Sequence, residues 1–120
     1  MTKKVFGVSH VPLSPAVRAG DFVYVSGQVP VTDGKIIDGD ISIQTAVVLD
    51  NIKAVLEEAG CTMSDVIKTF VILTDKKNFA AFNTAYASYF PSNPPARTTI
   101  ESDLMVDITV EIDAIAYKPL

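Results

Sequence analysis

Val110-Glu111-Ile112-Asp113-Ala114-Ile115-Ala116 is the stretch that decides the fold of this 120-residue chain. Side chains alternate in direction along a strand, so one face of this segment is purely apolar. The opposite face changes from acidic to apolar along the strand. The apolar face suits the packing of helices. Because no third helix is available for the mixed face, we expect a neighbouring subunit to cover it.

Two helices are predicted upstream of this strand. The first begins at Asp40 or Ser42 and ends at Ala59, just before Gly60. The second begins at Asp75 and continues through Phe90. Apolar residues recur at three- and four-residue steps in both helices. In the second helix these residues form an aromatic stripe that we assign to the core: Phe79, Phe82, Tyr86 and Tyr89.

Strands are predicted at residues 5–8, 16–19, 22–26, 66–74, 97–103 and 107–117, with a turn at residues 32–35. The strand at residues 66–74 is apolar on both faces, which is typical of a central strand. We therefore expect a single α+β domain spanning residues 1–120. It should contain a mixed β-sheet with two helices packed on one face.

Composition limits the possible partners. The net charge is −4 and the lysines are scattered, whereas nucleic-acid binders usually have a basic patch, so we do not expect nucleic acid as a partner. No apolar run approaches the roughly 20 residues of a membrane span, so no membrane partner is expected. A mean hydropathy of +0.30 favours self-association. We expect a cytoplasmic protein, and import into an organelle stays open.

Cysteine and histidine are too few for most metal and nucleophile sites. Cys61 and His10 are the single cysteine and the single histidine of the chain. Structural zinc sites use four sulfur or nitrogen ligands, and a Cys-His nucleophile pair would need these two residues to meet by folding. We therefore expect no metal site.

One arginine and one glutamate are the best candidates for chemistry. Arg97 lies in Pro94-Pro95-Ala96-Arg97-Thr98-Thr99-Ile100 at the start of a predicted strand, and its guanidinium can grip a carboxylate at two points. Glu111 can move a proton if its surroundings are partly desolvated. The alternative is a structural ion pair of Arg97 with Glu101 or Asp103, or with Glu111 itself.

Five segments together resemble one protein family over nearly the whole chain. They are residues 20–30 (GDFVYVSGQVP), 49–60 (LDNIKAVLEEAG), 79–86 (FAAFNTAY), 95–99 (PARTT) and 110–112 (VEI). In order and spacing they resemble the RidA family (YjgF, reactive intermediate deaminase), which is also called endoribonuclease L-PSP.

The resemblance implies a chorismate-mutase-like α+β fold and a homotrimer with sites between subunits. It implies hydrolysis of 2-imino or enamine acids, such as 2-iminobutanoate and 2-iminopropanoate, to 2-keto acids and ammonia without a cofactor. The older family name implies RNA cleavage and inhibition of translation instead. A third possibility is a non-catalytic trimer that binds a small carboxylate such as a keto acid.

The resemblance also assigns roles to individual residues. Arg97 would bind the substrate carboxylate, and the backbone at Thr99 would orient the imine. Glu111 would position or activate the attacking water and relay a proton. The pocket would further include Ser26 and Asn83.

Two more positions of the implied pocket concern its shape. Gly27 would keep the backbone open. Leu13 stands where the family usually has a pocket tyrosine, and leucine cannot form the hydrogen bond that tyrosine offers. The substrate range, and the activity itself, therefore depend on whether Leu13 disables or retunes the site. A shifted loop would let His10 or Ser14 supply the polar group.

Overall fold

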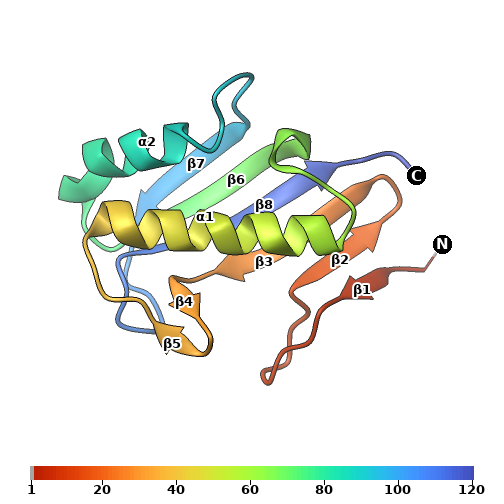
Figure 1. Ribbon diagram of the computed structural model, residues 1–120, viewed down its shortest axis with the longest axis horizontal. Helices are drawn as coiled ribbons and strands as arrows, with labels where there is room; N and C mark the ends of the chain where they lie inside the picture. The colour runs from red at the N-terminus through yellow and green to blue at the C-terminus, as the bar shows by residue number, and fades with distance from the viewer. Residues whose placement is uncertain (1) are drawn as a thin grey trace.

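The computed structural model describes residues 2–120 as a six-stranded sheet and a separate small hairpin (Figure 1). The sheet order is β1-β2-β3-β8-β6-β7. β6 and β7 are parallel and the other neighbours are antiparallel, so the sheet is mixed as predicted. The strands are β1 (Lys4–Phe6), β2 (Ala16–Ala19), β3 (Phe22–Gln28), β6 (Val66–Leu73), β7 (Ala96–Glu101) and β8 (Val110–Tyr117), and the hairpin is β4 (Val31–Thr32) and β5 (Lys35–Ile36).

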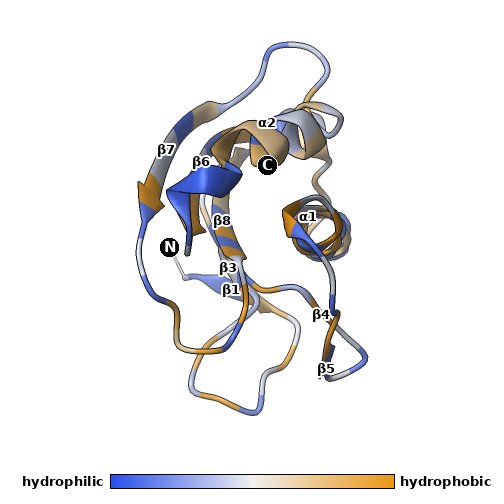
Figure 2. Ribbon diagram, turned by 90° about the vertical axis from the view of Figure 1, so that its left-hand side faces the viewer, coloured by the Kyte–Doolittle hydropathy of each residue, from blue (hydrophilic) through white to orange (hydrophobic). Residues whose placement is uncertain are grey.

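Both long helices cover the same face of the sheet, as Figure 2 shows from the side. Helix α1 (Ile41–Glu58) begins after Asp40, whose side chain accepts a hydrogen bond from the Ile43 amide at 3.0 Å. This N-cap satisfies one of the free amides of the first turn, and it confirms Asp40, rather than Ser42, of the two predicted starts. The chain leaves the helix at Gly60, where φ is +82°.

Helix α2 (Phe79–Ala87) is shorter than predicted at both ends. Asp75 caps a separate 3₁₀ turn, Lys76–Asn78, by accepting a hydrogen bond from the Lys77 amide. At the other end the Phe90 amide bonds to the Ala87 carbonyl, three residues back, so the helix tightens before Pro91. Apolar spacing continues through both segments, which is why the sequence pattern alone extended the helix.

The core lies between the helices and the sheet. From α1 it receives Val48, Leu49, Ile52 and Leu56, none of which is exposed to solvent. From β8 it receives the predicted apolar set, because burial alternates strictly from Val110 to Ala116. Residues 107–109, which we expected to extend β8, form the loop that leads into it.

The outer face of the sheet, turned away from both helices, has no covering layer within the described residues 2–120 (Figure 2). It presents large apolar side chains to solvent, and the rings of Phe22 and Tyr117 lie 5.3 Å apart on it. Tyr24 and Ile100 are also exposed there. Soluble monomers seldom leave a continuous surface of this kind open. No helix within residues 2–120 combines the length and the apolar character needed to cross a bilayer.

Candidate active site

Arg97 lies on the edge strand β7 and faces the helices. Its guanidinium carbon is 5.7, 5.4 and 4.9 Å from the ring centres of Phe79, Phe82 and Tyr86. An arginine within about 6 Å of an aromatic face is attracted by the ring quadrupole. Three rings of α2 thus hold the cation in place, and its hydrogen-bond donors have no partner among residues 2–120.

The predicted alternative of a structural ion pair for Arg97 is wrong within one chain. Among residues 2–120 the ion pair formed is Lys118 with Asp65, at 3.9 Å. The Glu101 carboxylate, one of the proposed partners, accepts a hydrogen bond from the Lys76 amide at 2.7 Å instead. The positive charge of Arg97 is therefore not neutralised by the described part of its own subunit.

Asn83 and Thr99 lie near Arg97 and supply unused polar atoms. Asn83 lines a hollow of about 480 Å³ together with Arg97, Tyr86 and Pro95. Thr99 follows Arg97 by two residues on the same face of β7. Within residues 2–120, Asn83 Oδ1 and Thr99 Oγ1 are buried without a hydrogen-bond partner. Buried polar atoms are normally paired, so these two are well suited to a ligand.

Glu111 lies on β8 with its carboxylate against Gly27. A β-carbon built on Gly27 would stand only 2.9 Å from Glu111 Oε2 and 3.0 Å from Cδ. Partial burial raises the pKa of Glu111, and the negative charge of Asp113, two residues further along the same face, adds to the rise. A raised pKa moves this carboxyl toward the range in which it can exchange a proton near neutral pH.

Arg97 and Glu111 lie on opposite faces of the sheet. Arg97 is in register with the buried Thr69, whose hydroxyl bonds to Tyr86 of α2 at 2.7 Å, so it is on the helix side. Glu111 is in register with Ile72 and is on the outer face. One chain therefore does not bring the two principal candidate residues together.

Ser26, Gly27 and Leu13 line a second hollow, of about 470 Å³, below α1. The Ser26 hydroxyl donates to the Ser14 carbonyl at 2.6 Å, and the Ser26 amide donates to the Pro15 carbonyl at 2.9 Å. Ser26 thereby fixes the loop that presents Leu13, whose side chain is half exposed. The structure groups these three residues in one hollow, with Gly27 against Glu111, whereas Arg97 lines a different hollow.

The sequence pattern did not predict that aromatic rings of α2 surround the guanidinium of Arg97. Phe82 and Tyr86 are buried as predicted for a core stripe, but Phe79 is 45% exposed. All three nevertheless contact the guanidinium. The sequence did contain one indication of this arrangement. The aromatic residues recur at steps of three and four on the helix that packs over the strand of Arg97, so their rings share one face of that helix.

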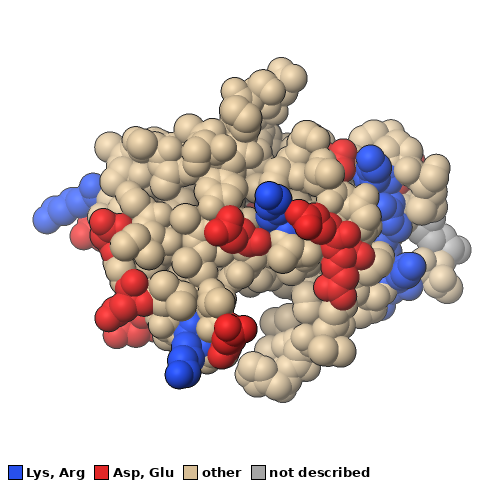
Figure 3. Space-filling model, viewed as in Figure 1, with Lys and Arg blue, Asp and Glu red and all other residues tan. Residues whose placement is uncertain are grey.

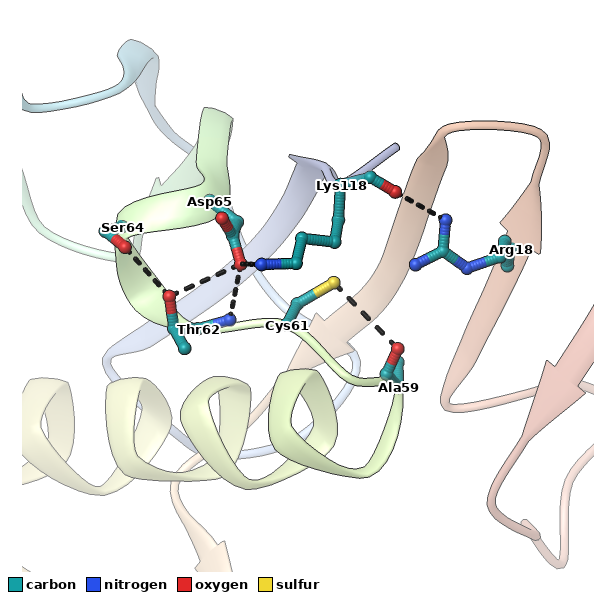
Figure 4. Close-up of polar contacts among 7 residues, drawn as sticks. All are labelled: Arg18, Ala59, Cys61, Thr62, Ser64, Asp65 and Lys118. Carbon is teal, nitrogen blue, oxygen red and sulfur yellow. Dashed lines mark hydrogen bonds and ion pairs between the residues drawn. The ribbon is translucent and has the colours of Figure 1, made fainter. Parts of the chain in front are cut away.

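Cys61 is unsuited to nucleophilic chemistry. It is buried after α1, and its Sγ lies 4.0 Å from the Ala59 carbonyl in a cluster with Asp65, Lys118 and Arg18 (Figure 4). Burial, and then the charge of Asp65, raise the pKa of the thiol, which disfavours the reactive thiolate. His10 lines the hollow below α1 instead. Within residues 2–120 no cluster of three or more His, Cys, Asp or Glu side chains is arranged to hold a metal.

Comparison with protein families identifies one match over residues 7–118, to the family model described as Endoribonuclease L-PSP. A RutC family protein of Pyrococcus horikoshii is 49% identical over 110 residues, which cover 89% of this chain and 87% of that protein. The mitochondrial protein MMF1 of Saccharomyces cerevisiae is 40% identical, with 88% and 74% of the two chains covered.

Solved structures share this fold over almost the whole length of the chain. A putative endoribonuclease of Thermotoga maritima superimposes with a TM-score of 0.93 at 34% identity, and 98% of each chain is covered. Escherichia coli TdcF, solved with bound serine, gives a TM-score of 0.90 at 32% identity, with coverage of 96% and 98%.

Proposed function

The chain belongs to the endoribonuclease L-PSP family, known also as the RidA/YjgF family, and from this membership we propose that it is a cofactor-free 2-imino acid deaminase. The reaction adds water across the carbon–nitrogen double bond of the imine. The tetrahedral adduct then expels ammonia, which leaves the 2-keto acid. Both protons of the attacking water must leave its oxygen, and two protons must reach the nitrogen, one as the adduct forms and one before ammonia departs.

The observation that supports this proposal most strongly is that the guanidinium of Arg97 forms no ion pair with any residue that the structure describes. Its three aromatic neighbours hold it without competing for its hydrogen bonds. A substrate carboxylate can therefore accept two parallel hydrogen bonds from it. Holding the substrate beside a placed water supplies much of the rate enhancement, because an imine is already electrophilic.

Glu111 provides the proton transfer in this scheme. Its ionised form takes a proton from the water as the oxygen attacks the imine carbon, and it passes this proton to the nitrogen. It then takes the remaining hydroxyl proton of the adduct and passes it to the nitrogen, so that ammonia leaves and the keto group forms. The half-buried position and the neighbouring Asp113 favour the proton-accepting step by raising the pKa of Glu111.

The complete site requires more than one copy, because the two residues lie on opposite faces of each sheet. We propose a homotrimer in which the uncovered outer face of one subunit, with Glu111 and Gly27, meets Arg97 and Asn83 of the next. Closed cyclic assemblies of this type use one contact repeatedly. The exposed apolar side chains of the outer face support it.

Mixing two inactive variants tests the chemistry and the assembly together. Arg97→Ala lacks the carboxylate anchor and Glu111→Gln lacks the base, so each alone should be inactive toward 2-iminobutanoate formed by a threonine dehydratase. After co-refolding at equal amounts, about a quarter of the subunit contacts combine an intact Arg97 with an intact Glu111 if trimers form at random. We expect release of 2-ketobutanoate to recover to about that fraction of wild type.

Two controls make the mixing result interpretable. Light scattering should give about three times the chain mass of 12.9 kDa for wild type and for both variants. Mixing without refolding should recover nothing if subunits do not exchange. If the co-refolded mixture is trimeric and the wild type is active, but no activity is recovered, then Arg97 and Glu111 of one site come from the same subunit. This result would refute a site shared between subunits.

Binding without turnover is the second candidate, and the serine bound to TdcF favours testing it. A wild-type protein that binds 2-ketobutanoate in calorimetry, yet does not accelerate hydrolysis of the imine, would establish a binding role. RNA cleavage, which the family description suggests, is tested with the same variants on nuclease-free protein. Cleavage that depends on Arg97 and Glu111 would replace the deaminase proposal.

A further inference from the structure

The hollow below α1 is a substantial recess on the helix side of the molecule. It lies between α1, the β4–β5 hairpin and the loop that joins β1 to β2, and Figure 3 shows the surface hollowed there. Its volume of about 470 Å³ is within the range of small-molecule sites. Apolar side chains contribute much of its wall, namely Val8, Leu13, Pro15, Val29, Ala54 and Val55.

The polar side chains at its base are already committed to the protein. The Asn51 amide group donates to the carbonyl oxygens of Val29 and Val31 at 3.0 and 2.9 Å. Gln28 Nε2 donates to the Ser26 carbonyl at 3.1 Å, and the Ser26 hydroxyl is bonded to the loop as described above. A ligand group in the hollow would therefore meet mainly apolar contacts in this region.

The hollow adjoins the position of the proposed base. Gly27 is part of its wall, and the same residue has the Glu111 carboxylate packed against its α-carbon. Ser26, the neighbour of Gly27 in sequence, and Leu13 also line the hollow. A molecule held with its reacting carbon near Glu111 would thus lie next to Gly27, a wall residue of this recess.

We propose that the hollow receives the side chain of the substrate and that Leu13 makes the protein select 2-imino acids with aliphatic side chains of three or four carbons. This inference rests on the proposed deaminase function and names its substrate class. Each methylene transferred from water onto an apolar wall strengthens binding. The polar lining residues Ser9, His10 and Asp33 do not change this gain for a side chain that contacts the apolar wall around Leu13.

A homologous series of imines tests the selectivity. A flavin-dependent amino-acid oxidase converts alanine, 2-aminobutyrate, norvaline and norleucine to imines whose side chains differ by one methylene each. We expect kcat/KM of wild type to rise roughly four-fold per added methylene. In Leu13→Ser the rise should become much shallower, so that the ratio of kcat/KM between the norleucine- and alanine-derived imines falls.

Two further variants separate the role of the hollow from general effects. Ala54→Leu, on an exposed helix position that lines the hollow, should selectively slow hydrolysis of the norleucine-derived imine by filling space. Leu120→Ser, a matched change at an exposed leucine remote from the hollow, should leave the whole series unchanged. Thermal melting of each variant verifies folding.

The outcomes distinguish this inference from the function on which it rests. Hydrolysis of all four imines at similar kcat/KM would overturn the selectivity and leave the deaminase intact. A rise along the series that survives both Leu13→Ser and Ala54→Leu would place the side chain elsewhere and overturn the assignment. Failure of wild type to accelerate any of the four would count against the deaminase function itself.

Discussion

Replacement of Gly27 by alanine should separate catalysis from folding. The new β-carbon would stand 2.9 Å from Glu111 Oε2 and 3.0 Å from Cδ, whereas unstrained contacts of this type lie near about 3.5 Å or beyond. The flexible carboxylate can yield, so it should move by roughly 0.5–1 Å. Displacement of a reacting group by about 1 Å can lower a rate by about 10²-fold. We therefore expect kcat/KM for 2-iminobutanoate to fall between about 10- and 100-fold.

Folding should not suffer from this change. Gly27 is not among the glycines with positive φ, so alanine is compatible with its backbone and should stabilise by up to about 1 kcal/mol through the unfolded chain. Gly60→Ala is the matched control, because Gly60 has φ of +82° and no atom lies within 4 Å of the point that its β-carbon would occupy. It should lower the melting temperature and keep full activity per folded molecule. Undiminished kcat/KM in Gly27→Ala would refute the position assigned to the Glu111 carboxylate.

Three other predictions follow from the same geometry. Arg97→Lys keeps the charge but loses the paired hydrogen bonds, so KM should rise about 10- to 100-fold in steady-state kinetics, and an unchanged KM would contradict carboxylate binding. Because burial and Asp113 raise the pKa of Glu111, and only the ionised form accepts a proton, activity should fall with decreasing pH at a midpoint above the ordinary 4.5. Asp113→Asn should move that midpoint to lower pH in the rate profile, and no movement would mean that Asp113 does not act on Glu111. Leu49→Ala, at a fully buried position of α1, should lower the free energy of unfolding by about 2–5 kcal/mol in urea denaturation, and a loss below about 1 kcal/mol would contradict its tight packing.

The fold could be predicted where local chemistry decides it. The alternation along β8 and the cap at Asp40 each depend on a few neighbouring residues, and both predictions are confirmed. The length of α2 could not be predicted, because a 3₁₀ turn and an α-helix present apolar residues at similar spacing. Whether a turn tightens depends on hydrogen bonds such as that of the Phe90 amide to Ala87.

The candidate residues could be named from the sequence, but not their mutual arrangement. The faces of Arg97 and Glu111 are set by the pairing of β6 with both β7 and β8, and these pairings join segments that are distant in the chain. The contact of Arg97 with the aromatic rings depends on the same strand pairing, because this pairing positions α2 above β7. Hydrophobic periodicity gives the faces of one element and contains no information on register between elements.

The placement of the tyrosines gives the protein an internal optical probe. The chain has four tyrosines and no tryptophan, so tyrosine dominates its ultraviolet emission. Tyr24 and Tyr117 lie exposed on the outer face of the sheet. Tyr86 is hydrogen-bonded to Thr69, and Tyr89 is hydrogen-bonded to Asp50. Burial, and then Asp50, raise the pKa of Tyr89 to about 12. Any layer that covers the outer face should therefore change the emission of Tyr24 and Tyr117 without a label, whereas the inner pair already packs in or against the core.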